Sequence, residues 1–285
     1  MGMLVKRNCK IFFRDKSAVF FSLLAVFIII ALYAVFLGDL VLQGLDWVPG
    51  AKELMNTWVM SGILGVCAVT TTMGAFGIMV DDRDKQISKD FLSAPIRRRD
   101  IAGGYLLSSF LIGMVMGLVT FLLCEGYIIL QGGSLLPLLA MLKVVGILAL
   151  SVLASTAMVY FFVSFFKSQN AFATASTILG TLIGFVTGVY IPIGDFPEAV
   201  QNIIKFFPLS HAGALFRQVM MEDAMAASLK GAPESTVAEF KESLGVVFTY
   251  GGNEAAPLVS VLVLLFTAVV FYLLSVAVIS RKKRA

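Results

Sequence analysis

Few ionisable residues in this sequence stand where membrane chemistry could use them. Glu125 and Lys143 interrupt two long apolar runs. Each lies nine residues from Ser134, near the tip of the turn that joins the runs, so an antiparallel hairpin brings them to equal depth. Pairing removes much of the cost of burying either charge. We expect Glu125 and Lys143 to form an ion pair that locks the hairpin, with a proton or substrate relay as the alternative.

The motifs of ATP-binding and hydrolytic enzymes are absent from the sequence. No G-x-x-x-x-G-K-[ST] loop is present to hold ATP phosphates, and no G-x-S-x-G elbow accompanies the serines. A single histidine, His211, excludes zinc sites that use several histidines. Cys9, Cys67 and Cys124 show no metal-ligand spacing, and none is placed for an extracellular disulfide. The chain is therefore not predicted to be an enzyme, and we expect His211 to satisfy loop backbone groups.

The composition is that of an integral membrane protein. Hydrophobic residues make up 59% of the 285 residues and charged residues only 14%, which excludes an ordinary soluble domain of this length. About 20 apolar residues in a helix cross the hydrocarbon core of a bilayer. Six runs reach that length: 18–37, 58–80, 103–130, 138–166, 171–191 and 258–279. The sequence thus predicts an all-α fold with six transmembrane helices.

Lysine and arginine are distributed unevenly between the two sides of these helices. Sixteen lie in the N-terminal arm, the 81–100 connector, the segment after the fourth run and the C-terminal end, against five on the opposite side. The positive-inside rule places both termini and the connector in the cytoplasm. We therefore expect a multi-pass protein of the cell membrane. The net charge of +4 follows from this topology and needs no nucleic-acid partner.

Residues 81–100, DDRDKQISKDFLSAPIRRRD, form a charged island between the second and third runs. They cannot lie in lipid, where each such charge costs roughly 2.5–3.5 kcal/mol at the helix centre. Ile87 and Phe91 are four residues apart, Leu92 follows, and Pro95 closes the segment. This spacing predicts a short charged helix with an apolar ridge on one side. A membrane protein that exposes such a ridge to water is expected to offer it to another protein.

Two further segments are predicted to lie at membrane surfaces within a single domain of residues 1–285. Residues 1–17 carry basic residues on one helical face and apolar residues on another, as in an interfacial amphipathic helix. An ordinary charged flank would show the same spacing. Residues 192–256 begin with an apolar stretch broken by Pro192, Pro197 and Pro208. We expect short re-entrant helices in the outer leaflet, followed by a small helical cap.

Small and hydroxyl residues mark two of the expected spans. The second carries Thr70, Thr71 and Thr72, and the fifth carries Gly180, Gly184 and Gly188, a tandem G-x-x-x-G pattern. Such residues let helix backbones approach closely and let side chains bond across helices. Close helix packing is one interpretation of these residues, and a lining for a transported molecule is the other.

Three of these features together resemble the type-2 permeases of ATP-binding-cassette (ABC) exporters. They are six spans with both ends inside, a mixed-charge connector after the second span, and the outer segment FFPLSHAGALFR with Phe207, Pro208 and Arg217. The order of features covers essentially the whole chain. The connector opens with Asp81 where the family usually has Glu, and residues 221–252 form a longer insert than in many members.

The resemblance implies a permease half that dimerises with a second permease, identical or paralogous, and binds two cytosolic ATPase subunits. Those partners would bind ATP and Mg²⁺, and this chain would hold no cofactor of its own. The cargo would be an amphiphilic drug, peptide or lipid-linked molecule, and membrane lipid would surround the chain. The implied coupling residues are Asp82, Arg83, Lys85, Ile87, Phe91 and Leu92.

The resemblance also implies a dimer and cargo path along the second and fifth spans and a gate on the outer side. The path would include Thr70, Thr71, Thr72, Thr177, Gly180, Thr181, Gly184 and Gly188. The gate would include Phe207, Pro208 and His211. Two other classes share parts of this pattern. One is an ion-coupled secondary transporter, and the other is a membrane receptor or scaffold that recruits a cytosolic partner through the connector.

Overall fold

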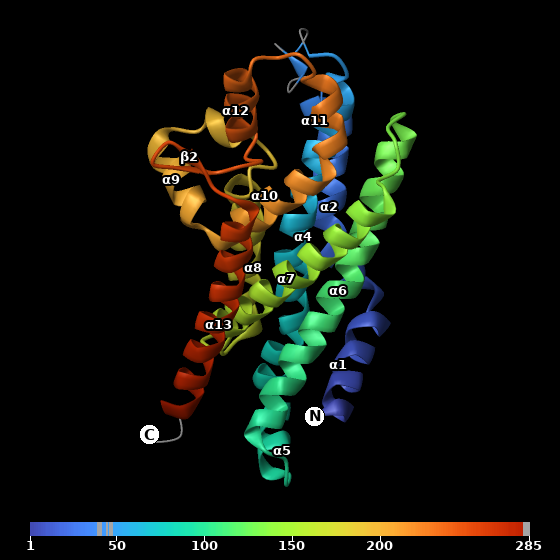
Figure 1. Cartoon of the computed structure of the whole chain (residues 1–285). Helices are drawn as coiled ribbons and strands as arrows, with labels where there is room; N and C mark the ends of the chain where they lie inside the picture. The colour runs from blue at the N-terminus through green and yellow to red at the C-terminus, as the bar shows by residue number, and fades with distance from the viewer. Residues whose placement is uncertain (39–41, 44, 46–47, 282–285) are drawn as a thin grey trace.

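Helix α4 (Ala51–Asp84) is the centre of the structure, and its middle is buried on every side. The computed structural model describes residues 1–38, 42–43, 45 and 48–281. In it, α4 packs against α2, α6, α7, α8 and α10 (Figure 1). Residues 54–69 are buried without interruption. A helix that is apolar all round has no polar face to turn toward solvent and therefore belongs inside a bundle.

Five other long helices complete the bundle. They are α2 (Lys16–Leu32), which continues into the π-helical turn η1 (Tyr33–Leu37), α6 (Arg98–Leu130), α7 (Leu138–Val163), α8 (Gln169–Val186) and α13 (Pro257–Arg281). Large apolar side chains on the outer faces of α2, α6, α7 and α13 are exposed. Lipid is as apolar as these side chains, so such faces suit a membrane and not water.

Within the described residues, five helices are long and apolar enough to cross a membrane: α2 with η1, α4, α6, α7 and α13. The predicted fifth run, residues 171–191, forms α8 and a turn that follows it. At 18 residues, α8 is about 27 Å long, slightly less than the ~30 Å hydrocarbon core. The all-α membrane fold is thus confirmed, whereas the count of six spans is not.

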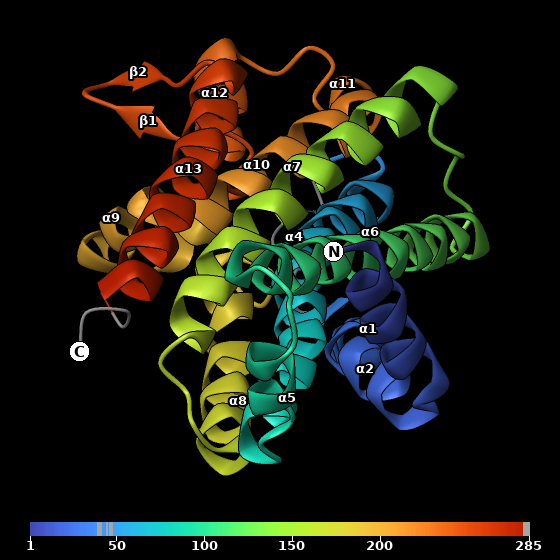
Figure 2. The ribbon, with the colours of Figure 1, turned by 90° about the horizontal axis from the view of Figure 1, so that it is seen from below.

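The N-terminus, the C-terminal end of α13 and the connector helix α5 (Ile87–Ser93) lie at one end of the bundle. Figure 2 looks onto this end, and α11 and α12 lie at the opposite end in Figure 1. This arrangement agrees with the predicted common side of the termini and the connector. Lys282, Lys283 and Arg284, which contributed to the predicted orientation, lie outside the described residues.

A separate helix, α1 (Gly2–Arg14), precedes the first long helix, as predicted for residues 1–17. It lies against α6, where Asn8 Nδ2 donates to Ser108 Oγ at 3.1 Å. The Asp15 carboxylate accepts a hydrogen bond from Ala18 N at 3.0 Å and so caps α2. This cap separates α1 from α2 and allows the chain to change direction between them.

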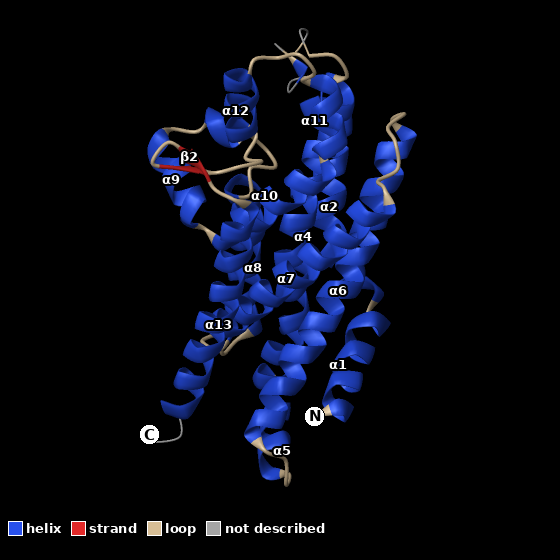
Figure 3. Cartoon of the chain, in the orientation of Figure 1, coloured by secondary structure: helices blue, strands red, loops and turns tan. Residues whose placement is uncertain are grey.

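The opposite end of the bundle carries a cap built from residues 192–256. Its elements are η2 (Ile193–Asp195), α9 (Glu198–Phe206), α10 (Pro208–Met220), α11 (Glu222–Ser228), α12 (Glu234–Ser243), β1 (Thr249–Tyr250) and β2 (Asn253–Glu254). The two strands pair antiparallel, with Thr249 opposite Glu254. Figure 3 shows this small hairpin among helices. The sequence predicted short helices here but not the hairpin.

The glycines of α6 and the glycine that ends α8 have different roles. On α6, a methyl group at Gly113 would lie 2.7 Å from Val152 Cγ1, and one at Gly117 would lie 2.7 Å from Leu148 Cδ1, so both glycines serve close packing against α7. Gly188 instead ends α8, with φ +66°. Its neighbour Val189 donates from N to Gly184 O at 2.9 Å, the 6→1 bond of a Schellman cap.

Arg217 of α10 joins the cap to the bundle from a fully buried position. Its Nη2 donates to Thr187 O at 2.9 Å and to Gly188 O at 2.8 Å, at the carbonyl end of α8. Its guanidinium lies 5.2 Å from the centre of the Trp58 ring on α4, and Nη1 donates to Gly245 O at 3.4 Å. One side chain therefore holds α4, α8, α10 and the segment after α12 together.

We predict that Arg217→Met destabilises the protein markedly. Methionine keeps most of the length but donates no hydrogen bond, and each buried carbonyl left unsatisfied costs about 1–3 kcal/mol. Thermal unfolding of the purified protein in detergent should show a lower midpoint than wild type. The control is Arg99→Met, which removes an exposed arginine at the start of α6. Equal midpoints for wild type and Arg217→Met would contradict this role.

Candidate functional site

The connector between α4 and α6 is shorter than predicted. Helix α4 continues to Asp84 and α6 begins at Arg98, so only residues 85–97 lie outside the long helices. Gln86 adopts a left-handed conformation with φ +63°, which turns the chain sharply from α4 into α5. The predicted short helix is present as α5, and Pro95 follows its end.

The predicted apolar ridge of α5 is only partly open. Ile87 and Phe91 are half-buried, whereas Lys89 and Ser93 are exposed. The guanidinium of Arg7, on α1, lies over the Phe91 ring at 5.2 Å from its centre. The side chain of Leu92 lies outside the described part of the chain. The ridge therefore lies beside α1, and a partner that binds it would contact both helices.

Asp82, one of the predicted coupling residues, is buried within the chain. Its carboxylate is buried and accepts two hydrogen bonds from Arg7, both at 2.7 Å, and one from the Tyr105 hydroxyl at 2.6 Å. A bidentate arginine–carboxylate pair is among the stronger charged contacts in proteins. The hydrogen bonds that Arg7 donates to Asp82 raise the pKa of Arg7 further, so Arg7 stays charged at any physiological pH. Asp82 thus fastens α1 and α6 to α4.

Arg83 is also used inside the chain. Its Nη1 donates to Val163 O at 3.0 Å and to Phe166 O at 3.3 Å, and so it satisfies carbonyls at the end of α7. Lys85 is exposed and pairs with Asp81 at 2.9 Å. Asp82 and Arg83 therefore hold the base of the connector within this chain, and the contact predicted between them and a partner stays a prediction.

A groove of about 630 Å³ lies between α2, α4 and α8. Four residues of the predicted cargo path line it: Thr70, Thr177, Gly180 and Thr181. The three threonine hydroxyls each donate to a carbonyl of their own helix, so their oxygens remain able to accept. A Cβ at Gly180 would meet no atom within 4 Å. The groove therefore offers acceptor oxygens on a wall that is mostly apolar and has no charged side chain.

The other four predicted path residues do not line this groove. Thr71 and Thr72 are buried and donate to Cys67 O and Ala68 O of their own helix. Gly184 lies against the ring of Tyr190, and Gly188 ends α8. The tandem glycine pattern is thus divided: Gly180 stays open, whereas Gly184 and Gly188 are used within the chain.

The predicted gate residues lie where α9 meets α10. Pro208 is the first residue of α10, and Phe207 before it is half-buried. His211 is buried, with Nδ1 2.9 Å from Ser260 Oγ of α13 and Nε2 3.1 Å from Lys205 O. The expectation that His211 satisfies a backbone group is confirmed, and the contact with Ser260 also ties α10 to α13.

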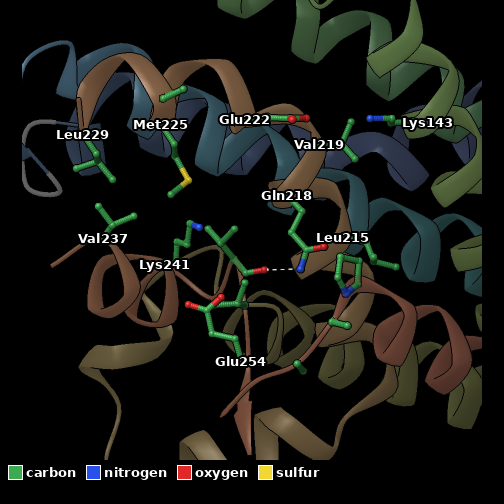
Figure 4. A pocket seen from close by; sticks show the side chains of 16 residues that line it. Lys143, Leu215, Gln218, Val219, Glu222, Met225, Leu229, Val237, Lys241 and Glu254 are labelled. Carbon is green, nitrogen blue, oxygen red and sulfur yellow. Dashed lines mark hydrogen bonds between the residues drawn. The ribbon is translucent and has the colours of Figure 1, made fainter. Parts of the chain in front are cut away.

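Glu125 and Lys143 do not pair, so the predicted ion pair is wrong. Glu125 is buried, and its Oε2 accepts a hydrogen bond from Leu136 N at 3.2 Å. Lys143 is exposed and lines a different cavity, near the N-terminal end of α7 (Figure 4). Helix α6 ends at Leu130, and the loop before α7 folds back over Glu125, so equal sequence offsets did not place the two side chains together.

Within the described residues, no group of three or more His, Cys, Asp or Glu side chains could hold a metal ion.

Trp58 had no predicted role, but its indole nitrogen donates a hydrogen bond to Leu244 O at 2.8 Å beside Arg217. The sequence signal for this contact was an arginine, Arg217, within a mostly apolar segment. The partners of Arg217 lie too far away in the sequence to be recognised from it.

Comparison with known proteins gives two matches. Residues 51–277 match the model of a family described as "ABC-2 family transporter protein". The Linearmycin resistance permease protein LnrN of Bacillus subtilis (strain 168) is 26% identical over 186 residues. The aligned part covers 65% of this chain and 47% of that relative, so the chain spans about half the length of the relative.

We predict that Asp82→Asn loosens α1 from the bundle and lowers stability by about 1–3 kcal/mol, because it removes the charge that Arg7 and Tyr105 bind. Thermal unfolding in detergent measures the loss. Asp81→Asn is the matched control, since it neutralises the neighbouring but exposed Asp81–Lys85 pair, and exposed pairs contribute little. Equal effects of the two substitutions would show that Asp82 has no special role.

Proposed function

The chain belongs to the ABC-2 family of transporter proteins, and from this membership we propose that it is the membrane permease of an ABC exporter that moves an amphiphilic cargo out of the cytoplasm. The match over residues 51–277 is the observation that carries the proposal. Permeases of this family are transmembrane subunits and not ATPases, in keeping with the missing phosphate-binding loop. The chain would lie in the cell membrane with six spans, α8 being the fifth, and with both termini cytoplasmic.

The partner would be a cytosolic ATPase that binds ATP and Mg²⁺ and receives α5 in a groove of its own. Helix α5 supports this role because it stands beyond the ends of α4 and α6, at the same end as both termini. Ile87 and Phe91 supply the apolar contact, and exposed Lys89 and Asp90 surround it. Asp82 and Arg83 fasten this contact to the bundle.

Helix α4 would carry motion from the ATPase into the membrane. It runs unbroken from Ala51 to Asp84, and α5 follows it after a two-residue turn. A buried, close-packed helix moves as a rigid body and not by local bending. Nucleotide bound to the ATPase can shift the permease between two states only if the complex holds nucleotide more tightly in one of them. The groove between α2, α4 and α8 would change its exposure in that step.

The groove supports an amphiphilic cargo, because none of the residues that line it carries a charge. Apolar side chains and threonine oxygens suit a molecule with a large apolar body and a few hydrogen-bond donors. One relative is named a resistance permease, and we extend this to expulsion of a drug, a peptide or a lipid-linked molecule. A second permease, identical or paralogous, would close the open side near Gly180, and Phe207, Pro208 and His211 would stand near the outer exit.

The proposal is tested by purification from native membranes in mild detergent, followed by reconstitution into vesicles. We expect a P-loop ATPase to co-purify and cargo flux to require ATP. Flux without any nucleotide-hydrolysing companion would instead indicate an ion-coupled secondary transporter. A stable partner that hydrolyses no nucleotide, with no flux, would indicate a receptor or scaffold.

We predict that Phe91→Asp prevents assembly with the ATPase and stops export. The substitution places a charge where the partner needs an apolar side chain, and burying it unpaired is costly. Co-purification with the ATPase measures assembly. Ser93→Asp adds the same charge to an exposed position of α5 and should leave assembly intact. Normal assembly of Phe91→Asp would remove α5 as the coupling contact.

We predict that Gly180→Leu blocks transport while the chain stays folded. A side chain at Gly180 extends into the groove without a clash inside the chain, so it competes with cargo or with the second permease. Vesicle flux and thermal unfolding separate these effects. Gly146→Leu on α7 is the matched control, because a Cβ there also meets no atom within 4 Å and lies outside the groove. Equal flux in the two variants would argue against the path.

A further inference from the structure

A small cavity of about 170 Å³ lies at the connector end of the bundle, between the end of α4, helix α5, the start of α6 and the end of α7. It is smaller than the roughly 300–1,000 Å³ of sites for drug-sized molecules, so it suits a compact group. The polar side chains that line it are those of Arg83, Ser88, Arg98, Tyr105 and Tyr160. Because the cavity is small, groups on its different walls can contact one occupant.

The hydroxyl group of Tyr160 is the feature of this cavity that packing alone does not explain. Only 4% of Tyr160 is exposed, and its ring packs against the Phe76 ring of α4 with the ring centres 5.7 Å apart. A phenylalanine would serve that packing equally well. The described part of the chain gives the hydroxyl no hydrogen-bond partner, although Tyr160 lines the cavity. Because buried polar groups are nearly always hydrogen-bonded, this hydroxyl indicates an occupant that accepts its proton.

Arg83 brings a positive charge to the same cavity. Its Nη1 donates to the carbonyls of Val163 and Phe166, but the N–H groups of Nε and Nη2 have no acceptor among the described residues. Arg83 is half-buried and takes part in none of the ion pairs of those residues. Its charge interacts with the Tyr160 hydroxyl, so the two groups lie close together. A planar guanidinium with unused N–H groups suits an oxyanion.

The other charges around the cavity also favour an anion. Arg98, which is exposed, adds a second guanidinium, and the half-buried Ser88 of α5 adds a hydroxyl. Among the described residues that line the cavity, none is acidic. Asp82 lies behind Tyr105 and accepts hydrogen bonds from Tyr105 and Arg7, so its charge is already paired. The Tyr105 hydroxyl uses its proton in that bond and does not donate to the occupant.

We propose that this cavity binds a phosphate group. Arg83 and Arg98 balance its charge, and the hydroxyls of Tyr160 and Ser88 donate hydrogen bonds to its oxygens. The bound group joins α5 to α4, α6 and α7, and so it holds the connector against the bundle. Binding is a property of this chain alone and does not depend on the proposed export function, so its failure would leave that function untouched.

The position of the cavity favours a lipid as the source of the phosphate. Helices α4, α6 and α7 are long enough to cross a membrane, and the cavity lies where α4 and α7 end and α6 begins. Lipid head groups lie at the ends of membrane-spanning helices, just outside the hydrocarbon core. A soluble phosphate ion offers the same chemistry, and the experiment separates the two sources.

The test is calorimetric titration of the purified protein in a non-ionic detergent and a phosphate-free buffer. The probes are dihexanoyl phosphatidylglycerol, inorganic phosphate, and dihexanoylglycerol, which has the same tails without phosphate. Tyr160→Phe should weaken phosphatidylglycerol binding roughly tenfold, the usual effect of losing one hydrogen bond to a charged group. It should unfold at the wild-type temperature, because the ring stays in place. The control Tyr127→Phe removes the same hydroxyl from α6 at the far end of the bundle and should bind normally.

A second pair of variants tests the charge. Arg98→Gln should weaken binding several-fold, whereas Arg99→Gln removes a neighbouring exposed arginine that does not line the cavity and should have little effect. Tighter binding of phosphatidylglycerol than of inorganic phosphate would assign the site to a lipid, and inorganic phosphate binding at least as tightly would assign it to a soluble ion.

Three results would overturn the proposal. The first is that neither phosphate probe binds, or that dihexanoylglycerol binds as tightly as phosphatidylglycerol. The second is wild-type affinity in Tyr160→Phe, or an equal loss in Tyr127→Phe. The third is an equal effect of Arg98→Gln and Arg99→Gln.

Discussion

The cap end of this protein depends on a buried arginine that has no carboxylate partner. The last carbonyls of a helix carry partial negative charge and lack partners of their own, and the planar guanidinium of Arg217 satisfies those of Thr187 and Gly188 together. Glycines make room for it: a Cβ at Gly62 would lie 3.1 Å from Nη2, and one at Gly245 would lie 3.0 Å from Nη1. The Arg217 guanidinium also lies over the Trp58 ring of α4. One side chain therefore fixes the positions of the end of α8 and of the cap relative to α4.

A comparable fastening occurs at the other end of α4. There the ionic roles are reversed, since a buried carboxylate, Asp82, is satisfied by Arg7 of α1 and Tyr105 of α6. Between these two points α4 is enclosed by other helices except at Thr70, Met73 and Gly74, which face the groove between α2 and α8. Helix α4 is therefore held by buried side chains near both of its ends, whereas the helices around it are covered on only some faces. Because α4 forms one wall of the groove, any displacement of α4 changes the shape of the groove.

Features that depend on neighbouring residues could be predicted from the sequence, and features that depend on distant partners could not. The long helices, α1 and α5 follow from runs of apolar residues, spacing and proline, which are local. The burial of Asp82 depends on an arginine 75 residues away, and charge in a loop-like segment gave no sign of it. The Glu125–Lys143 pairing assumed a symmetric hairpin, but the loop before α7 supplies Leu136 N as the partner of Glu125. The four-residue spacing of glycines did not predict a single role either. It belongs to a helix contact at Gly113 and to a helix end at Gly188, and the difference depends on residues distant in the sequence.

The backbone angle φ of Gln86 sets the bend between α4 and α5. Gln86 is the single non-glycine residue with positive φ in the described chain, and an L-residue there gives up roughly 1–2 kcal/mol relative to the right-handed region. Glycine would adopt the angle without that strain, but it would also admit many other angles. Glutamine at this position costs a little stability but restricts the backbone more than glycine would. Its side-chain oxygen also accepts a hydrogen bond from Lys89 Nζ of α5. The bend therefore keeps α5 at a defined angle to the end of α4.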